Sequence, residues 1–341
     1  MATAHTSFGE RLVDRLNTQF LSKDLERSLR LQGVTASVKV SVLGEGGWPN
    51  DFAIERHGQS YLATLSASAQ RRFVIGSRHF LRAYLYWMTQ TPSEVRRMTV
   101  NGSDGDRPSR ARFAASAPPD RQVPIPDPHF WLYRGFKSER VRANTAPPWQ
   151  DRSDLIVWRG LANGAGRMSL DPADRANPAV IQRLRMCMLL AEAEGCDVRV
   201  NGIAEDDGAW TGPARQLGLA GDSLPAQSWL TRKYAIDIDG QTNTWSNLLV
   251  RMLFGCCVFK VESQFGYRQW YYDRIRPFEH YIPVRADMSD FIEKIDWARS
   301  HPAEAGAIAE RGQRFAMALD FEAGRRDAVD LITANWDKPA P

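Results

Sequence analysis

The stretch DLIVWRGLANGAGR, from Asp154 to Arg167, contains the pattern that decides the fold class. Its apolar and aromatic residues, Leu155–Trp158, predict a buried strand that ends at the cation of Arg159. A loop of small residues follows, and Arg167 stands eight positions after Arg159. A strand that leads into a cation and a glycine-rich loop is typical of a site that holds an anion.

Strand and helix patterns alternate along the rest of this half of the chain. A helical pattern over residues 178–195 leads to the short strand DVRVNG, and KYAIDIDG, NTWSNLLVRMLFG and CCVFKV then indicate strand, helix and strand. Asn243 or Thr244 is the expected cap of the second helix. The alternation predicts an α/β fold in which helices cover both faces of a parallel sheet.

The chain is long enough for two domains, and its composition changes between them. The first part carries helical patterns near residues 12–25 and 71–89 with strand patterns between them. From Asn101 to Pro148, Pro, Gly, Asp and Arg dominate, which indicates either a linker or a site-forming segment; such a length inside a compact chain favours the second. We expect domains at 1–148 and 149–321, with a helix at 322–341 packing back on the first.

The composition is that of an ordinary soluble protein. Of the 341 residues, 43% are hydrophobic and 25% charged, and the net charge of +4 is too mild to indicate nucleic acid, because acidic residues are interleaved throughout. The four cysteines have no metal-ligand spacing and indicate reduced thiols. The N-terminal stretch lacks an apolar signal core and no apolar run is long enough to span a membrane, so we expect a cytoplasmic protein.

Two stretches are candidate anion sites, because ligands of open parallel sheets bind beyond the carboxyl ends of the strands. In the first, Arg159 and Arg167 flank GLANGAG, whose small residues let backbone amides approach a phosphate; the alternative is a surface turn with two solvated arginines. In the second, Asn243–Trp245 would present the amides and positive dipole of a helix start; the alternative is an ordinary capped turn. Two such anion sites on one sheet would suit a diphosphate.

Carboxylate pairs offer a possible cation site. Asp237 and Asp239 form Asp-x-Asp on one face of a strand, and Asp104 and Asp106 have the same spacing. Aspartates this close are also common in turns, and the six histidines show no ligand spacing. The aromatic stretch YRQWYYDRIRPFEHYIPV, residues 267–284, would stack a base or sugar ring or, as the simpler alternative, pack inside the protein.

Several of these motifs, in the same order and spacing, resemble glycosyltransferase family 90. The family comprises LpsA-like lipopolysaccharide and capsule enzymes in bacteria and Rumi-type protein O-glucosyltransferases in animals. The resemblance runs from Asp154 to Phe321 through the Trp-Arg-Gly loop and the motifs KYAIDIDGQTNTW, GCCVFKVES, RQWYYDRIRPFEHYIPVRADMSD and IAERGQRFA.

The resemblance implies a GT-B architecture, two Rossmann-like domains that face a central cleft, with a UDP-sugar donor on the C-terminal domain. It implies an inverting transfer of glucose or xylose that needs no divalent metal, so that Asp237 and Asp239 would orient their turn instead. The donor-binding residues that it implies are Arg159, Gly160, Arg167, Asp239, Gly240, Asn243, Trp245 and Glu262.

The base of an inverting transfer must stand on the acceptor side. In Rumi-type relatives an aspartate of an Asn-x-x-Asp stretch serves, and Asn101-Gly-Ser-Asp104, followed by PIPDPHFW, lies at the matching place. Asp104 is therefore the expected catalytic base, and Asp106 and Asp127 are its competitors.

Differences from the family leave the substrates open. The animal enzymes carry an arginine where this chain has TNTWSN, and Cys256-Cys257 replaces a more usual serine with leucine or proline. The acceptor would be a saccharide, a lipid-linked saccharide or a protein hydroxyl in lipopolysaccharide or surface polysaccharide synthesis, with peripheral inner-membrane contact if it is lipid-linked. The alternative function is a catalytically silent nucleotide- or carbohydrate-binding protein on the same fold.

Overall fold

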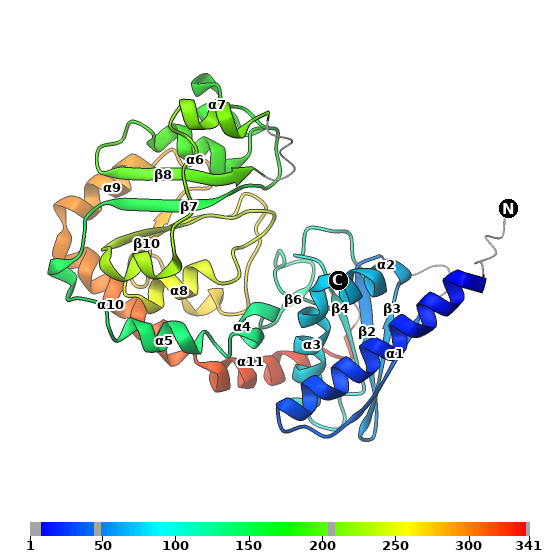
Figure 1. Ribbon diagram of the computed structural model, residues 1–341. Coiled ribbons are helices and arrows are strands. Elements are labelled where there is room, and N and C mark those ends of the chain that lie inside the picture. Colours follow the sequence, from blue (N-terminus) through cyan, green and yellow to red (C-terminus); the bar gives the residue numbers. More distant parts are fainter. Residues whose placement is uncertain (1–7, 44–48, 204–208, 339–341) are drawn as a thin grey trace. The chain divides into compact units, whose positions relative to one another are not determined.

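The computed structural model describes residues 8–43, 49–203 and 209–338 (Figure 1). The chain divides into two compact units, residues 1–132 with 322–341, and residues 133–321. The first division therefore lies after Leu132, whereas the sequence placed it after residue 148. The segment between these positions goes with the second unit because its helix α5, Lys137–Ala143, packs on α8, Asn247–Leu253.

The first unit contains a mixed sheet of six strands in the order β1-β3-β2-β4-β5-β6. Strand β2 runs antiparallel to β3 and β4, and the other neighbouring pairs are parallel. The strands are β1 (Ser37–Val42), β2 (Asp51–His57), β3 (Ser60–Leu65), β4 (Arg97–Asn101), β5 (Phe113–Ala114) and β6 (Val123–Pro124).

Helices cover this sheet with apolar stripes. Helix α1 packs on β1 through Leu21, Leu25 and Leu29, which recur every four residues and are buried. The helix expected at 71–89 is divided by a π-helical turn, Phe73–Ser77. The helices of this unit are α1 (Phe8–Leu31), α2 (Ala67–Arg72), α3 (Arg78–Gln90), α4 (Pro128–Leu132) and α11 (Phe321–Thr333).

The second unit contains five parallel strands in the order β11-β10-β9-β7-β8. Every residue of β9 and β10 is buried, which requires that both faces of the sheet be covered. The expected α/β class and parallel sheet are confirmed. The strands are β7 (Ile156–Ala162), β8 (Cys196–Ile203), β9 (Tyr234–Asp237), β10 (Cys257–Val261) and β11 (Ile282–Val284).

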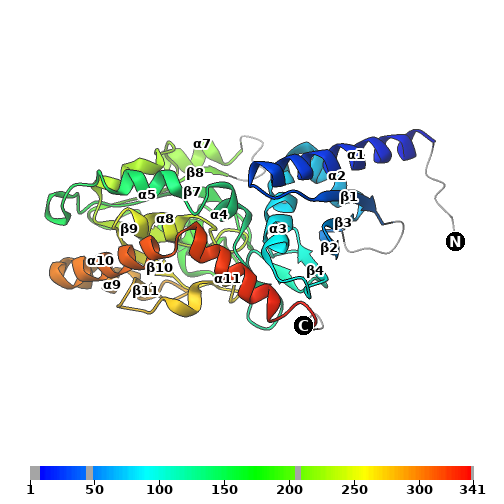
Figure 2. The ribbon, with the colours of Figure 1, turned by 90° about the horizontal axis from the view of Figure 1, so that it is seen from below.

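The helices of the second unit lie before, between and after its strands. Helix α6 packs on β7 and β8, and α8 and α10 pack on β10 (Figures 1 and 2). Among the described helices none is both long and apolar enough to cross a membrane. Besides α5 and α8 the helices are α6 (Gln182–Leu190), α7 (Thr211–Gln216), α9 (Phe291–Ser300) and α10 (Pro302–Ala318), with 3₁₀ turns at Trp149–Asp151, Pro172–Ala176, Ala226–Thr231 and Tyr272–Arg274.

Two local expectations were wrong. Strand β7 does not end at Arg159, because its pairing with β8 continues through Gly160 and, after a bulge, to Ala162. Helix α8 does not begin at Asn243 or Thr244 but at Asn247, and its N-cap residue Ser246 makes no side-chain capping bond. The expected anion site at a helix start over Asn243–Trp245 is therefore absent from this part of the described structure.

Candidate functional site

The loops that follow β7 and β9 meet at the carboxyl edge of the second sheet. These two strands are neighbours, and the order of strands along the chain reverses between them, which is where open α/β sheets bind ligands. Gly164 has a φ of +128°, and a Cβ built on it would lie 2.9 Å from the carbonyl oxygen of Gly240. A Cβ on Gly240 would lie 2.9 Å from Oδ1 of Asn163, so the contact requires glycine on both sides.

A narrow pocket opens beside this contact. It encloses about 260 Å³, the solvent at its mouth included. Its walls are backbone, uncharged polar side chains and the apolar side chains of Ala165 and Phe265, and Asp239 is the charged residue among them. Two of the expected donor residues, Asp239 and Gly240, belong to it. The lining residues are Asn163, Gly164, Ala165, Gln182, Asp239, Gly240, Gln241, Gln264, Phe265 and Tyr267.

Arg183, near the start of α6, joins the two loops. Its buried guanidinium donates to the carbonyl oxygens of Asp239 at 2.8 Å and Leu161 at 3.0 Å, and to Oδ1 of Asn163 at 2.5 Å. Burial lowers the pKa of Arg183 to about 10, and the nearby carboxylates of Asp239 and Asp237 oppose that shift. Arg183 therefore fixes the position of one loop relative to the other.

Asp237, the last residue of β9, and Asp239, two residues later, stabilise the turn that follows the strand. Oδ1 of Asp237 accepts hydrogen bonds from Thr244 Oγ1 at 2.5 Å and Asn247 Nδ2 at 2.9 Å, and Oδ1 of Asp239 accepts one from Asn243 Nδ2 at 3.0 Å. Asn243 and Thr244 are consequently engaged with carboxylates and not with a helix start. Burial raises the pKa of Asp239, while a hydrogen bond from Ser263 and the charge of Lys260 lower it.

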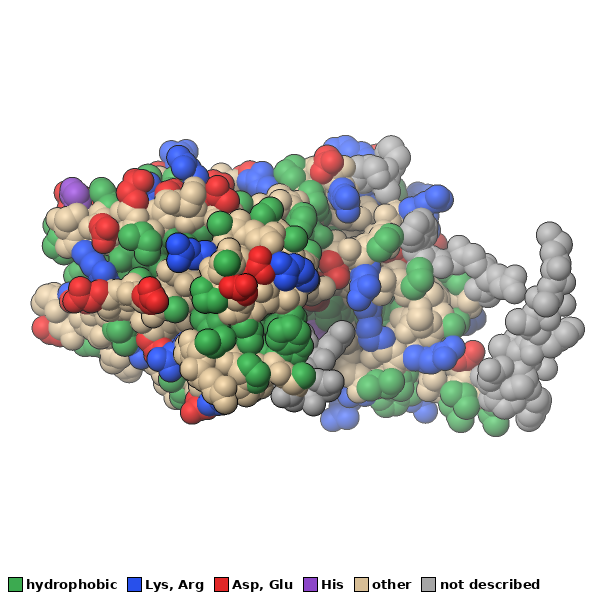
Figure 3. Space-filling view, turned by 90° about the horizontal axis from the view of Figure 1, so that it is seen from above, with side chains coloured by type: hydrophobic (Ala, Val, Ile, Leu, Met, Phe, Trp, Pro, Cys, Tyr) green, Lys and Arg blue, Asp and Glu red, His purple; other side chains and the backbone are tan. Residues whose placement is uncertain are grey.

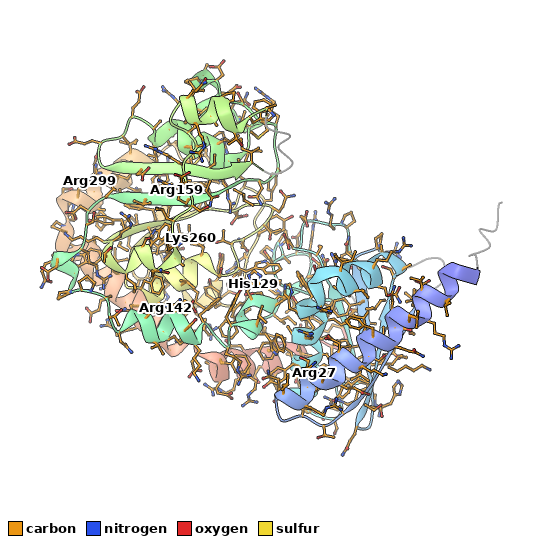
Figure 4. All side chains as sticks on the ribbon, in the orientation of Figure 1. Arg27, His129, Arg142, Arg159, Lys260 and Arg299 are labelled. Atoms are coloured by element: carbon orange, nitrogen blue, oxygen red, sulfur yellow. The ribbon has the colours of Figure 1, made fainter. Side chains whose placement is uncertain are left out.

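Lys260 supplies a buried positive charge beside these aspartates. It lies opposite Asp237 in the register of β10 and β9, and its Nζ stands 4.5 Å from the centre of the Tyr272 ring (Figure 4). Among the described residues no group of three or more His, Cys, Asp or Glu side chains could hold a metal ion.

Arg159 stabilises the sheet instead of lining the pocket. It lies in the middle of β7, and its side chain is only 8% exposed (Figure 4). Its guanidinium donates to the Asp197 carboxylate at 2.6 Å and to the carbonyl oxygens of Asp197 and Trp158 at 2.7 and 2.8 Å. These bonds tie β7 to β8.

Arg167 is a half-exposed cation at the end of the same loop. It donates to Oδ2 of Asp174 at 2.7 Å, and its backbone amide donates to the Ala179 carbonyl. Neither Arg167 nor Arg159 is among the residues that line the pocket. The two arginines are therefore not brought together at this site.

The remaining expected donor residues also lie outside the pocket wall. Gly160 is required by packing, because a Cβ there would stand 2.6 Å from the Trp158 ring. Trp245 is partly exposed in the turn before α8, and Glu262 is an exposed residue directly after β10. The aromatic stretch is mostly core, with Tyr271 and Tyr272 buried, whereas Tyr267 lines the pocket.

The sequence did not single out Gln182, Arg183 or Gln264. The signal for the first two was present: polar side chains open the helix that follows the glycine loop, at positions where an amphipathic pattern would place apolar residues. Gln264 stands in the loop after β10, on the same sheet edge as the other two loops, so sheet topology alone would have indicated it.

In the first unit, Asp104 stands in a tight loop after β4. Oδ1 of Asn101 accepts from the amide of Ser103 at 3.0 Å, Ser103 Oγ accepts from the Gly105 amide at 3.1 Å, and Gly105 has a φ of +107°. The carboxyl of Asp104 is exposed. Partial desolvation raises its pKa and the charge of Asp106 raises it further, against the lowering effect of Arg72 and Arg107.

The two competitors for the role of base have different environments. Asp106 is partly exposed, and its Oδ2 lies 3.5 Å from Nε of Arg107. Asp127 is fully buried, where its Oδ1 accepts from the amides of His129 at 2.8 Å and Phe130 at 3.0 Å. Burial raises the pKa of Asp127 to about 7, and these amide bonds offset part of the rise. Asp104 and Asp106 thus have surface exposed to solvent, whereas Asp127 has none.

A family model matches residues 133–322, slightly more than half of the chain. Its description is glycosyl transferase family 90. The matched residues coincide with the second compact unit, residues 133–321, which carries the pocket at the edge of the parallel sheet.

Curated relatives match over about half of the chain. Protein O-glucosyltransferase 2 of Danio rerio is 30% identical over 177 residues, which cover 52% of this chain and 31% of that protein. The uncharacterized protein 179R of Invertebrate iridescent virus 6 is 26% identical over 187 residues, 50% of this chain and 16% of that protein. The chain thus spans a third or less of the length of these two relatives.

Solved structures show weaker likeness. HepE of Anabaena in complex with UDP and glucose is 12% identical, covers 58% of this chain and 52% of its own, and superposes with a TM-score of 0.36. The sucrose-phosphate synthase of Thermosynechococcus elongatus is 12% identical, covers 92% of both chains and has a TM-score of 0.42.

Proposed function

The chain belongs to glycosyl transferase family 90, and from this premise we propose that it is an inverting glycosyltransferase. It moves a sugar, glucose or xylose, from a UDP-sugar to a hydroxyl acceptor. The reaction class follows the family and the protein O-glucosyltransferases among its relatives.

The observation that carries this proposal is the contact between the loops of Gly164 and Gly240 at the point where strand order reverses. Glycines leave the backbone uncovered, so that main-chain amides and the adjacent amide side chains can approach a diphosphate closely. Asp239, Gly240 and Asn243 form or support the wall of this donor site, and Arg167 offers a cation at the end of the loop. Arg159 acts indirectly, because it holds β7 in place.

The transfer needs a base and a stabilised leaving group. Asp104 takes the proton of the acceptor hydroxyl, whose oxygen forms a bond to the anomeric carbon as the bond from that carbon to the diphosphate breaks. UDP departs with the electron pair of that bond, and preorganised amides and the cation lower the free energy of the charge that develops. The exposure of Asp104 supports its assignment over Asp127.

No divalent cation is required in this proposal. The carboxylates of Asp237 and Asp239 accept hydrogen bonds from Asn243, Thr244 and Asn247, which gives them a role in holding the turn. Chelation should therefore leave transfer unchanged.

The acceptor is a saccharide, a lipid-linked saccharide or a protein hydroxyl, and lipopolysaccharide or surface polysaccharide synthesis is the proposed setting. We place the protein in the cytoplasm, in peripheral contact with the inner membrane if the acceptor is lipid-linked. The four cysteines carry free thiols, which suits a reducing compartment. On the face shown in Figure 3, acidic and basic side chains lie next to one another, which favours these acceptors over nucleic acid.

The test is a thermal-shift and calorimetric screen of the protein against UDP, UDP-glucose, UDP-xylose and other nucleotide sugars, with and without chelator. The proposal expects one UDP-sugar to bind and to release UDP slowly in the absence of acceptor. Binding without any release or transfer would indicate the silent binding protein instead. Absence of binding to every UDP compound would refute a UDP-sugar donor.

A further inference from the structure

A second pocket in the same unit is lined by residues of helices α5 and α8 and of the segments that precede them. The two helices pack against each other (Figure 1). It encloses about 530 Å³, the solvent in its open mouth included. Its lining residues are Tyr133, Phe136, Glu139, Ala226, Ser246, Asn247, Val250 and Arg251. None of them belongs to the donor pocket beside Gly240.

One wall of this pocket is aromatic. The rings of Tyr133 and Phe136 stack with their centres 6.2 Å apart and their planes inclined by 26°. Phe136 is buried, whereas Tyr133 is 50% exposed and presents apolar ring area to solvent. Aromatic area beside a few placed polar groups is the usual composition of a site for a small organic ring.

The other walls carry polar groups of complementary kinds. Ser246 and Asn247 come from the start of α8, and Arg251 follows one turn later. The guanidinium of Arg251 stacks on the Trp229 ring at 3.6 Å and donates one long hydrogen bond, 3.4 Å, to the Ala226 carbonyl. Glu139 of α5 contributes a carboxylate, which accepts from Ser138 Oγ at 2.7 Å and from Nη1 of Arg142, outside the pocket, at 3.3 Å.

The charges of this pocket balance. Glu139 and Arg251 are its only ionisable side chains besides the Tyr133 phenol, so it offers one negative and one positive group. A diphosphate would meet the Glu139 carboxylate at a cost, whereas the hydroxyls of a sugar both donate and accept. We propose that the pocket lined by α5 and α8 binds the pyranose ring of an uncharged saccharide, with its apolar face on Tyr133 and its hydroxyls on Glu139, Arg251 and Asn247.

The aromatic wall is held in place before any ligand binds. Gly135 has a φ of +64°, and a Cβ there would stand 2.6 Å from the backbone nitrogen of Phe321. The guanidinium of Arg140 donates to the carbonyl oxygens of Met317 at 2.8 Å and Leu319 at 2.5 Å. Because these contacts fix the start of α5, ring binding loses little entropy to ordering of the wall.

The source of the ring rests on the proposed function. A glycosyltransferase handles two saccharides, the sugar of its donor and that of its acceptor, and either would supply a pyranose. The donor sugar and the acceptor sugar offer the same hydroxyls and apolar ring face to the pocket. Competition between a methyl pyranoside and UDP-glucose distinguishes the two sources.

The experiment is ligand-observed saturation-transfer NMR on the full chain with methyl glucoside, methyl xyloside, methyl galactoside, uridine and UDP as separate probes. At least one methyl pyranoside should receive saturation. Tyr133→Ala should lower its affinity about fivefold or more, because aromatic packing is lost. Glu139→Gln, which keeps shape and removes the charge, should also weaken it. Val141→Ala, at a position 64% exposed on the same helix and outside the pocket, should change nothing.

The outcomes separate the two proposals. Displacement of the methyl pyranoside by UDP-glucose identifies the donor sugar as the source, and simultaneous binding identifies the acceptor. Saturation of UDP but of no pyranoside overturns the pocket proposal and leaves the donor site standing. Pyranoside binding that neither Tyr133→Ala nor Glu139→Gln weakens, or loss of uridine binding in these variants, also overturns it. Absence of all UDP binding refutes the proposed function alone.

Discussion

Gly164 and Gly240, 76 residues apart in the chain, approach so closely that a single methyl group on Gly164 would stand 2.9 Å from the carbonyl oxygen of Gly240. The contact joins the loops after β7 and β9, the two neighbouring strands between which the order of strands along the chain reverses. Most of the proposed donor site depends on this contact, since it brings Asn163 and Asp239 to one pocket.

Gly164→Ala should damage the donor site. The backbone φ of +128° disfavours any side chain, and the new methyl group would push the Gly240 loop away. We expect a loss of about 1 kcal/mol or more in the free energy of unfolding and at least a tenfold weaker affinity for UDP-sugar. Urea unfolding and calorimetry measure the two. Gly212→Ala, where nothing lies within 4 Å of the added Cβ, is the matched control. Unchanged affinity in Gly164→Ala would place the donor elsewhere.

Arg183→Met should separate the two loops. It leaves the carbonyl oxygens of Leu161 and Asp239 and the side chain of Asn163 without their buried donor, which should cost roughly 3 kcal/mol of unfolding free energy. UDP-sugar affinity should fall with it. The control is Arg185→Met on the same helix, because Arg185 is buried with Nε and Nη2 lacking acceptors among the described residues. Equal effects of the two substitutions on UDP-sugar affinity would contradict the positioning role of Arg183.

The sequence predicted the parallel sheet well because strands buried on both faces are continuous apolar runs. CCVFKV and KYAIDIDG show this signal, and the helix between them has the expected period. The ion-pair partner of Arg159 in β7 was harder to predict, because it is the carboxylate of Asp197 in β8, 38 residues later in the chain. Local pattern shows where a cation lies, but not which distant acceptor binds it.

The turn after β9 shows a different kind of failure. Asn243 and Thr244 are good helix caps, but their side chains donate to Asp239 and Asp237 and the helix starts at Asn247. Two roles compete for the same polar side chains, and cap preference alone does not decide between them. Arg183 was missed for a related reason: its acceptors come from two loops that are far apart in the chain.

Asp104→Asn should abolish most transfer and leave UDP affinity intact. The amide cannot take the acceptor proton, so we expect turnover to fall about 10²–10⁴-fold. Asp106→Asn should retain turnover but move the acidic limb of the rate profile to lower pH, because the charge of Asp106 helps to raise the pKa of Asp104. Steady-state kinetics between pH 4 and pH 8 would show both effects. If Asp106→Asn loses transfer and Asp104→Asn keeps it, the roles are exchanged.

Asp127 should make the protein less stable as pH rises. Burial raises its pKa from 3.8 to about 7 in the folded state, so between these values the folded chain holds a proton that the unfolded chain has released. The free energy of unfolding then falls with rising pH, by at most about 1.4 kcal/mol per unit for one group. Asp127→Asn stays neutral, and its amide oxygen can still accept from His129 and Phe130.

Urea unfolding of wild type and Asp127→Asn at pH 5, 6, 7 and 8 isolates this contribution, since groups common to both proteins cancel in the difference. The free energy of unfolding of Asp127→Asn, relative to that of wild type, should increase at each step from pH 5 to pH 7. Above pH 7 this difference should level off, because the Asp127 carboxyl of wild type is then ionised in both the folded and the unfolded state. Asp120→Asn, an exposed carboxyl of the same unit, provides the reference for a charge removed without burial. A difference that stays constant from pH 5 to pH 8 would mean that Asp127 is ionised throughout, and that its buried carboxylate is stabilised by its two amide donors alone.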